Sequence, residues 1–312
     1  MIAICASHIP KIHKLKTGQA SLDRLLDSGI KTQEISELFG PAGNGKTQIA
    51  LTLSLQTLLS DTSAHVVYLS TEHYFPIKRF TQMMNESITN IDHSRISTDP
   101  IQHMIQPELT HESIKVSNYF QSLDGTIEDK IQLEAVNESI RETNHSQSSN
   151  NSTKDTNRIT NRMHILNILD ATHQLHLIKY NLIHFIKQNK DIKLIVLDSV
   201  SGHFRGLLQS HLETSKSVYE MGSSLKKIAY ECNVAVVVLN QVSDVFDADY
   251  SSEKFKAALG GGWEACVNTK LMVKKSASGK RSVSVCYGPN RAPGSIDFRI
   301  GIKGIEEFQE ES

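Results

Sequence analysis

The sequence predicts an α/β fold in which a mainly parallel sheet is flanked by helices, with β-hairpins near the C-terminus and a disordered insertion. Apolar segments of strand length alternate with segments of helical pattern, at spacings typical of βαβ units. The best-defined strands are Ile35–Phe39, His65–Ser70, Lys193–Leu197 and Val234–Leu239, with helices over about Lys46–Leu59 and 214–231. Because strands joined by crossover helices run parallel, we expect a parallel sheet.

The other elements follow from local signals. Ser21 is a good N-cap for a helix whose leucines Leu22, Leu25 and Leu26 share one face, and Gly29 supplies its C-terminal stop. Further along we predict a helix starting over Ile77–Met84, strand His164–Leu169, an amphipathic helix near 171–188, and short strands Thr269–Lys274, Ser282–Tyr287 and Ile296–Ile302. The last three strands are separated by turn residues and are expected to form hairpins.

A polar run interrupts this pattern in the middle of the chain. Residues 142–161 contain one apolar residue, Ile159, and such a segment cannot bury enough surface to offset its ordering entropy. We therefore predict a disordered loop inside a wider, largely disordered insertion. The predicted organisation is a linker with a short helix at 1–33, a core formed by 34–89 and 163–312, and the insertion at 90–162.

Composition and charge limit the possible functions. With 39% hydrophobic and 21% charged residues, the chain has an ordinary soluble balance, and its longest apolar stretches are too short to span a membrane. The N-terminus has no charged segment before its apolar run, so no signal peptide is expected. Four scattered cysteines without a CxxC pair favour a reduced, intracellular protein over a disulfide scaffold or a zinc site. Because counterion release usually needs a basic excess, the formal net charge of −1 implies that any contact with nucleic acid is local or shared with a partner.

Residues 40–47 match the phosphate-binding motif G-x-x-x-x-G-K-[ST] completely. In this motif glycines let backbone N–H groups surround the phosphates, and the following helix adds its positive N-terminal end. Lys46 would reach the β- and γ-phosphates, and the Thr47 hydroxyl would ligate Mg²⁺. The predicted nucleotide-binding residues are Gly40, Pro41, Ala42, Gly43, Asn44, Gly45, Lys46 and Thr47. The alternative is a glycine-rich turn that binds nothing, but the strand before the motif and the helix after it favour phosphate binding.

Several polar residues follow predicted strands and are candidates for the chemistry of a bound nucleotide. Asp198 ends an apolar strand and would hold the hydration shell of the metal, or it would cap a helix instead. Glu72 lies just past another strand and would orient an attacking water, or it is a plain surface acid. Asn240 and Gln241 leave a third strand together and either sense the γ-phosphate or form a turn.

Taken together, these stretches resemble the RecA superfamily, specifically the eukaryotic RecA-type recombinase and its mediator paralogues in homologous recombination. The segments Ser-Thr-Glu…Pro-Ile-Lys-Arg and Leu-Asn-Gln-Val, in this order, are its most specific part. The resemblance runs through Lys14–Leu26, Ile35–Gln48, Tyr68–Phe80, Leu194–Arg205, Val234–Val242, Ala258–Val273 and Tyr287–Pro293. It implies a RecA-like P-loop ATPase core with ATP and Mg²⁺ as cofactors, and a nuclear role in recombination and repair of DNA damage.

The resemblance also implies roles for single residues. Glu72 falls on the position of the water-activating glutamate, and Arg79 on that of an arginine that lies against the adenine ring. Gln241 matches a glutamine that couples the γ-phosphate to the DNA-binding loop beyond it. Gly288–Pro293 matches a segment that caps the nucleotide of a neighbouring subunit. The implied catalytic residues are therefore Lys46, Glu72 and Gln241.

The chain departs from the recombinase in two places. Only 39 residues precede Gly40, where the recombinase carries a helical DNA-binding domain ahead of its core. The counterpart of the second DNA loop, about Val242–Gly262, contains more acidic than basic residues, with Asp244, Asp247, Asp249 and Glu253 against Lys254 and Lys256. A net-negative loop is a poor binder of phosphates. The stretch Gly260–Ala265 looks more like the mediator paralogues.

The sequence therefore predicts an ATP-binding recombination mediator with weak DNA-dependent ATPase activity. It would pair with another recombinase paralogue, contact recombinase filaments, and bind single-stranded DNA weakly or through partners. One alternative is a DNA-dependent ATPase that itself forms filaments and exchanges strands, and another is a RecA-like ATPase outside DNA repair. The apolar segment Met1–Ala6 would add a strand to the sheet of a partner, or it is a frayed terminus.

Overall fold

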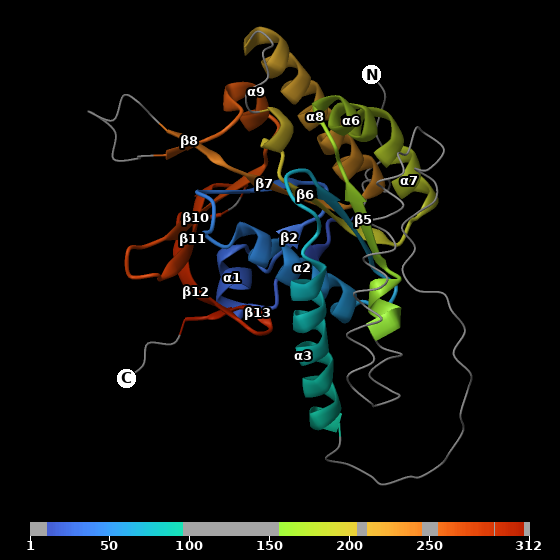
Figure 1. Ribbon diagram of the computed structural model, residues 1–312, viewed down its shortest axis with the longest axis vertical. Helices are drawn as coiled ribbons and strands as arrows, with labels where there is room; N and C mark the ends of the chain where they lie inside the picture. The colour runs from blue at the N-terminus through green and yellow to red at the C-terminus, as the bar shows by residue number, and fades with distance from the viewer. Residues whose placement is uncertain (1–10, 96–155, 205–210, 245–254, 290, 309–312) are drawn as a thin grey trace.

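A nine-stranded sheet forms the centre of the protein (Figure 1). The computed structural model describes residues 11–95, 156–204, 211–244, 255–289 and 291–308. In sheet order the strands are β13 Gly304–Glu307, β12 Ser295–Gly301, β11 Arg281–Tyr287, β10 Thr269–Lys275, β3 Ile35–Phe39, β7 Ala235–Asn240, β6 Ile192–Asp198, β4 His65–Ser70 and β5 Met163–Asn167. Neighbouring strands are parallel from β10 to β5 and antiparallel from β10 to β13. All the parallel strands therefore point their carboxyl ends toward one edge.

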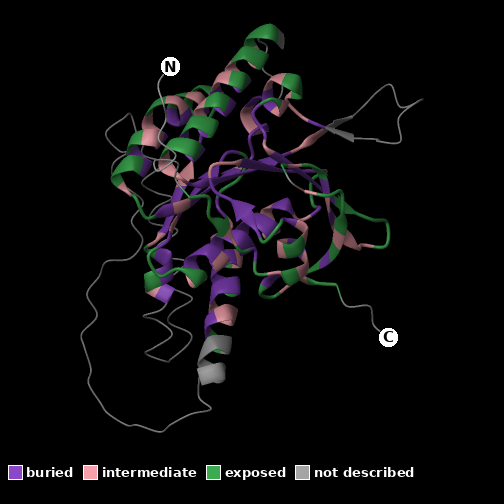
Figure 2. Cartoon of the chain, turned by 180° about the vertical axis from the view of Figure 1, so that it is seen from behind, coloured by how far each residue is buried: buried purple, intermediate pink, exposed green. Residues whose placement is uncertain are grey.

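Helices cover both faces of the sheet. They include α1 Ala20–Leu25, α2 Lys46–Ser60, α3 Ile77–Arg95, α6 Ala171–His176, α7 Leu182–Gln188, α8 His211–Cys232 and α9 Gly260–Glu264, and the π-helical segment η3 Leu177–Asn181 joins α6 to α7. Buried side chains of α1, α2 and α3 pack in one core, and those of η3, α7 and α8 in the other. Figure 2 shows buried residues concentrated in the sheet and on the helix sides that face it.

The two cores explain why the central strands are apolar at nearly every position. In β4, Val66 and Tyr68 belong to the first core, whereas Val67 and Leu69 belong to the second. Successive side chains of a strand point to opposite faces, so a strand covered on both sides has no solvent face. Two short strand pairs lie outside the main sheet, β1 Lys14–Leu15 with β2 Ile30–Lys31 and β8 Val242–Asp244 with β9 Phe255–Ala257.

The predicted fold class is confirmed, including the parallel sheet and the C-terminal hairpins. Strand His65–Ser70 coincides with β4, and the other predicted strands overlap observed strands. The prediction for 171–188 is confirmed as α6, η3 and α7 in succession. Strand β13 is an addition, because its four residues carry too short a pattern to be distinguished from a turn.

The predicted ends of the first helix are wrong. The N-cap is Gln19, not Ser21, and the backbone N–H of Ser21 donates to the Glu307 carboxylate of β13 at 3.0 Å. A residue far along the chain thus satisfies the helix end that the local pattern assigned to Ser21. Gly29 does not end the helix, whose C-cap is Leu26. A Cβ at Gly29, where φ is +127°, would lie 2.3 Å from the Leu15 carbonyl oxygen, so this glycine allows β1 and β2 to approach.

The disorder prediction for 142–161 is wrong at its C-terminal end. Residues 156–160 form a helix, and Ile159 is 4% exposed within the first core. The Arg162 guanidinium, next to this helix, donates to the carbonyls of Leu58, Asp61 and Ala64 at 2.8–2.9 Å, which ties the segment to the end of α2. A single apolar residue suffices because these charged hydrogen bonds add to its burial.

Other predictions concern residues without structural description. The segment 96–155, which makes up most of the proposed insertion, and the apolar segment Met1–Ala6 lie outside the described residues. Helix α3 runs to Arg95, beyond the proposed core boundary at residue 89. Within the described part of the chain, every helix is too short or too polar to cross a membrane.

Candidate nucleotide-binding site

The glycine-rich loop joins the carboxyl end of β3 to the N-terminus of α2. Gly45 is the N-cap of α2 and has a φ of +107°, a backbone conformation that favours glycine. At Gly40 the loop passes so close to β10 that a Cβ would lie 2.1 Å from the Val273 carbonyl oxygen. Asn44 is buried and donates to the same carbonyl oxygen at 3.0 Å. The loop is therefore anchored to the sheet while its other side stays open.

A hollow of about 410 Å³ lies over this loop. Its volume is within the range of small-molecule sites. The residues that line it include Ala42, Gly43, Gly45, Lys46 and Thr47 from the loop and α2, together with Glu72, Asp198, Ser199 and Gln241 from the ends of β4, β6 and β7. Of the predicted loop residues, Gly40, Pro41 and Asn44 build the loop and do not line the hollow.

Lys46 is held inside its own loop. Its ammonium group donates to the carbonyl oxygens of Gly40 at 2.6 Å and Pro41 at 2.9 Å, and the residue is only 8% exposed. These contacts keep the Nζ atom next to the hollow that the lysine lines. A cation in this position, beside the N-terminus of α2, makes the floor of the hollow attractive to phosphate.

Thr47 and Asp198 meet beside the loop. The Thr47 hydroxyl donates to Asp198 Oδ2 at 2.9 Å, and the Tyr68 hydroxyl donates to the same oxygen at 2.8 Å. Burial raises the pKa of the Asp198 carboxyl, and these two donors offset part of that rise. A hydroxyl and a carboxylate beside a phosphate cradle are the oxygen ligands that suit Mg²⁺, so this pair fits the metal that accompanies a nucleotide.

The patterns had not indicated Tyr68. It is fully buried in β4, and burial raises the pKa of its hydroxyl, which keeps the proton that it donates. The sequence did contain a signal for this residue, a tyrosine on an apolar central strand. A buried phenol needs a hydrogen-bond partner, so such a tyrosine predicts a polar group beside it.

Glu72 and Gln241 form another part of the lining of the hollow. The Gln241 Nε2 atom lies 2.5 and 2.6 Å from the two carboxylate oxygens of Glu72. The Ser199 hydroxyl donates to Glu72 Oε1 at 3.2 Å. Two residues 169 positions apart in sequence are thus brought together at the end of the sheet. The arrangement fixes a carboxylate next to the hollow and near the phosphate loop.

Asn240 points away from this hollow. It is fully buried and donates to the Glu37 carboxylate at 2.7 Å and to the Ala258 carbonyl at 2.9 Å. Of the two amides that the sequence placed together, only Gln241 lines the hollow. The side chains diverge because neighbouring residues at a strand end face opposite sides.

Arg79 lies beside the hollow without lining it. Its guanidinium donates to the Gln48 side chain at 2.9 Å and to the carbonyl oxygens of Gly301 and Ile302 at 2.5 and 3.2 Å. Gln48 does line the hollow, as does Ile300 in β12. Arg79 therefore fastens α3 to α2 and β12 beside the hollow.

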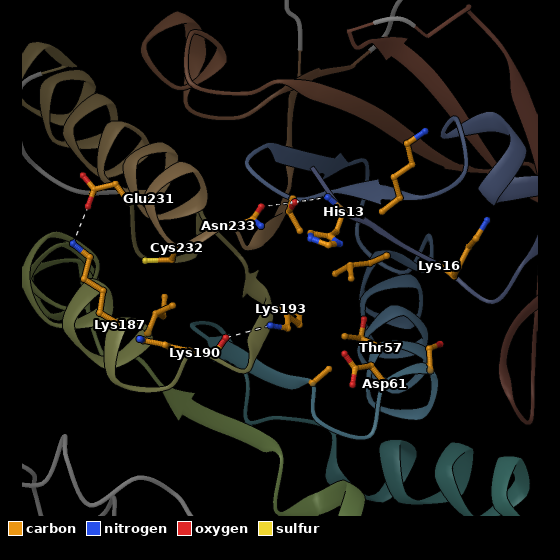
Figure 3. A pocket seen from close by; sticks show the side chains of 16 residues that line it. His13, Lys16, Thr57, Asp61, Lys187, Lys190, Lys193, Glu231, Cys232 and Asn233 are labelled. Carbon is orange, nitrogen blue, oxygen red and sulfur yellow. Dashed lines mark hydrogen bonds and ion pairs between the residues drawn. The ribbon is translucent and has the colours of Figure 1, made fainter. Parts of the chain in front are cut away.

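A second and larger hollow, of about 640 Å³, opens at the amino ends of the strands (Figure 3). Figure 3 shows Lys187, Lys190 and Lys193 on one side of it and His13 and Lys16 on the other. Helices α2, α7 and α8 all end at this hollow. Cations next to helix C-terminal ends neutralise the negative ends of the helix dipoles, which explains the lysines without a ligand. The nucleotide candidates all lie at the opposite edge.

The sequence model of the Rad51 family matches residues 9–101 and 108–308. The match includes the glycine-rich loop and every strand that ends at the smaller hollow.

Proposed function

Because the chain belongs to the Rad51 family of RecA-type recombinases, we propose that it is an ATP-binding mediator that helps recombinase filaments assemble or persist on single-stranded DNA. Membership of this family itself supports a role in DNA recombination and repair. The observation that carries the proposal is that the phosphate loop, the Thr47–Asp198 pair and the Glu72–Gln241 pair line one hollow.

The loop supplies the phosphate cradle. Backbone N–H groups at the N-terminus of α2 attract the phosphates, and Lys46 would exchange its carbonyl acceptors for phosphate oxygens. A bound Mg²⁺, held through Thr47 and Asp198, would neutralise phosphate charge. Glu72, fixed by Gln241 and Ser199, would orient a water toward the terminal phosphate. Arg79 would lie toward the base at the rim.

ATP serves mainly as a switch at a subunit interface in this proposal. Gly288–Pro293 corresponds to the segment with which one subunit of the family covers the nucleotide of the next. Turnover by the isolated chain is therefore slow, since part of the charge that develops on the terminal phosphate lacks stabilisation. The partner is another recombinase paralogue in a heterodimer, and the complex acts in the nucleus.

Weak binding of DNA by the chain alone is supported by charge. Between Ser243 and Leu259 the sequence contains four acidic residues and two lysines. Anionic side chains repel the DNA backbone, so single-stranded DNA is bound weakly or through the partner and the filament.

Steady-state ATP hydrolysis, measured with and without single-stranded DNA, tests this function. We expect slow hydrolysis by the isolated chain with little stimulation by DNA, and none above background in Lys46→Ala. The Glu72–Gln241 contact favours a second candidate, an ATPase that itself forms filaments and exchanges strands. Strong stimulation of the isolated chain by DNA would support this enzyme and contradict the mediator.

Co-purification from cells tests the partnership. We expect a second paralogue to be recovered with the chain, and deletion of residues 1–7 to reduce its recovery if that segment adds a strand to the partner. Recovery that is unchanged by the deletion would reject the role of the segment. In a Lys46→Ala strain we expect loss of viability after DNA breaks, and normal viability would argue for a role outside repair.

A further inference from the structure

Glu37 is a carboxylate buried in the middle of β3. It is 0% exposed, and on both sides the neighbouring strands are buried, β7 along its whole length and β10 in its first five residues. An ionised group at such a position is costly unless it is paired and hydrogen-bonded. An apolar residue would fill this position in a central strand at a lower free-energy cost of burial. The groups that the Glu37 carboxylate holds in place therefore indicate its role.

One oxygen of Glu37 accepts two hydrogen bonds from separate elements. Asn240 Nδ2 donates to Glu37 Oε1 at 2.7 Å, and the indole Nε1 of Trp263 donates to the same atom at 2.8 Å. Asn240 is the last residue of β7, and Trp263 lies in α9. Between them in sequence lies the β8–β9 hairpin. A single oxygen thus fastens both ends of the segment 241–262 to the strand that leads into the phosphate loop.

The bond to Glu37 also sets the orientation of the Asn240 amide. Its nitrogen donates to Glu37 and to the Ala258 carbonyl, so its oxygen is left to accept from the Gln241 backbone N–H, at 2.8 Å. The Ala258 N–H in turn donates to the Gln241 carbonyl at 2.9 Å. The backbone of Gln241 is thereby held on both sides, and its side chain reaches Glu72.

The second oxygen of Glu37 is held by charge. Within the described part of the chain Oε2 has no hydrogen-bond partner, and it lies 3.9 Å from the Lys270 ammonium. Lys270 is itself buried, is paired with Glu264, and lies over the ring of Phe39 at 5.1 Å. Burial raises the pKa of the Glu37 carboxyl, and Lys270 together with the two donors on Oε1 offsets part of that rise.

We infer that Glu37 is a positioning residue that sets the Gln241–Glu72 contact and the base of the β8–β9 hairpin together. Through it, the hairpin and the wall of the nucleotide hollow share one anchor on β3. The effect on nucleotide turnover rests on the proposed function, whereas the effect on the hairpin base does not.

Hydrogen exchange on the full chain without nucleotide tests the anchor directly. In Glu37→Gln the weaker acceptor should speed exchange at the amides of Gln241 and Ala258 about fivefold to tenfold, the loss expected for a charge-assisted bond. Amides in the middle of β6 serve as an internal reference for global opening. Glu34→Gln, one residue before β3, is the matched control and should leave both amides unchanged. Unchanged exchange at both amides in Glu37→Gln would overturn the inference.

Trp263→Phe provides a second variant that retains ring packing but lacks the indole N–H. It should speed exchange at the Ala258 amide and leave exchange at the β6 amides unchanged. If Glu37→Gln fails to fold, this variant decides the question, and equal exchange at Ala258 in wild type and Trp263→Phe would overturn the inference.

Kinetics separates positioning from a general structural role. In Glu37→Gln the kcat for ATP hydrolysis should fall about tenfold while KM for ATP changes by less than about twofold, since Glu72 acts on the reacting water and not on binding. An equal loss of kcat in Glu34→Gln, or a change in KM alone in Glu37→Gln, would reject the role of Glu37 as a positioning residue. If the wild-type chain binds no ATP, the proposed function fails, and the exchange measurement still decides the anchor.

Discussion

Gly202 offers a way to displace Glu72 without touching the phosphate loop. It begins the short 3₁₀ helix η4, Gly202–Phe204, which follows β6. A Cβ at this position would lie 2.6 Å from Glu72 Cγ and 2.7 Å from Thr71 Oγ1. Gly202 does not have a positive φ, so alanine fits the backbone and the effect of Gly202→Ala comes from the contacts of its Cβ with Glu72 and Thr71.

The size of the effect follows from these distances. Carbon atoms in contact are separated by about 3.5–4.0 Å, so Glu72 has to retreat by about 1 Å. Its contacts with Gln241 at 2.5 and 2.6 Å and with Ser199 at 3.2 Å cannot all survive such a shift. A displacement of about 1 Å in a reacting group typically lowers the rate about 100-fold. Nucleotide affinity should change little, because the three atoms nearest to the new Cβ belong to Glu72 and Thr71 and not to the phosphate loop.

Single-turnover hydrolysis at saturating Mg-ATP, together with binding of a fluorescent ATP analogue, measures the two effects separately. Gly261→Ala is the matched control, since a Cβ there meets nothing within 4 Å and its φ is not positive. We expect Gly202→Ala to hydrolyse ATP about 100-fold more slowly than Gly261→Ala at equal nucleotide affinity. Equal hydrolysis in the two variants would refute the role of Glu72 in orienting water.

Three further changes have predictable outcomes. Tyr68→Phe removes one of the two hydroxyl donors to Asp198, so the pKa of that carboxyl should rise further and the affinity for Mg²⁺ in the presence of ATP should fall several-fold, measured by titration calorimetry. Arg162→Met removes three hydrogen bonds to carbonyls at the end of α2 and should lower the free energy of unfolding by about 2 kcal/mol in urea. His164 is 6% exposed, and burial lowers its pKa to about 4 from 6.5. The imidazole is neutral in the folded state, so its contribution to the free energy of unfolding is present above pH 6.5 and is lost as the pH falls to about 4. This loss amounts to about 3 kcal/mol, and His164→Leu should abolish it.

Each of these predictions has an outcome that contradicts it. An Mg²⁺ affinity in Tyr68→Phe equal to that of wild type would show that Thr47 alone orders the carboxylate. Arg162→Lys controls for charge and should be nearly as unstable as Arg162→Met, because one ammonium cannot reach all three carbonyls. A free energy of unfolding equal to that of wild type in either variant would contradict the role of these hydrogen bonds. For His164, an equally steep decline of stability with falling pH in wild type and His164→Leu would assign the dependence to other groups.

The sequence identified those parts of the fold whose signals are local. Continuous apolar runs predicted the central strands because both of their faces are buried, and the phosphate loop has a motif of its own. The first helix was misplaced because its N-terminal amide at Ser21 is satisfied by Glu307 in β13, which no window around Ser21 contains. Residues 156–160 were assigned to a loop for a similar reason, since their order depends on Arg162 and on the carbonyls at the end of α2.

The candidate site divides along the same line. The position of Asp198, Glu72 and Gln241 at the hollow could be predicted because a polar residue that follows an apolar strand marks the edge where ligands of parallel sheets gather. Glu37 and Tyr68 could not, because each lies inside an apolar strand and has its partners on other elements that are distant in the sequence. A buried polar residue in such a strand nevertheless predicts that partners exist, even when it does not name them.

The two adjacent amides show how far that reasoning extends. Side chains alternate along a strand, so Asn240 and Gln241 cannot both face the nucleotide hollow, and the one turned away needs buried hydrogen-bond partners. The strand pattern contained this constraint but not its solution. Only pairing of β7 with β3 brings Glu37 to the side of Asn240, and only the return of the chain through α9 adds Trp263 to the same oxygen. The residue that faces the hollow is therefore held in place by a residue that never reaches it, and a change at Glu37 should be detected first at Gln241.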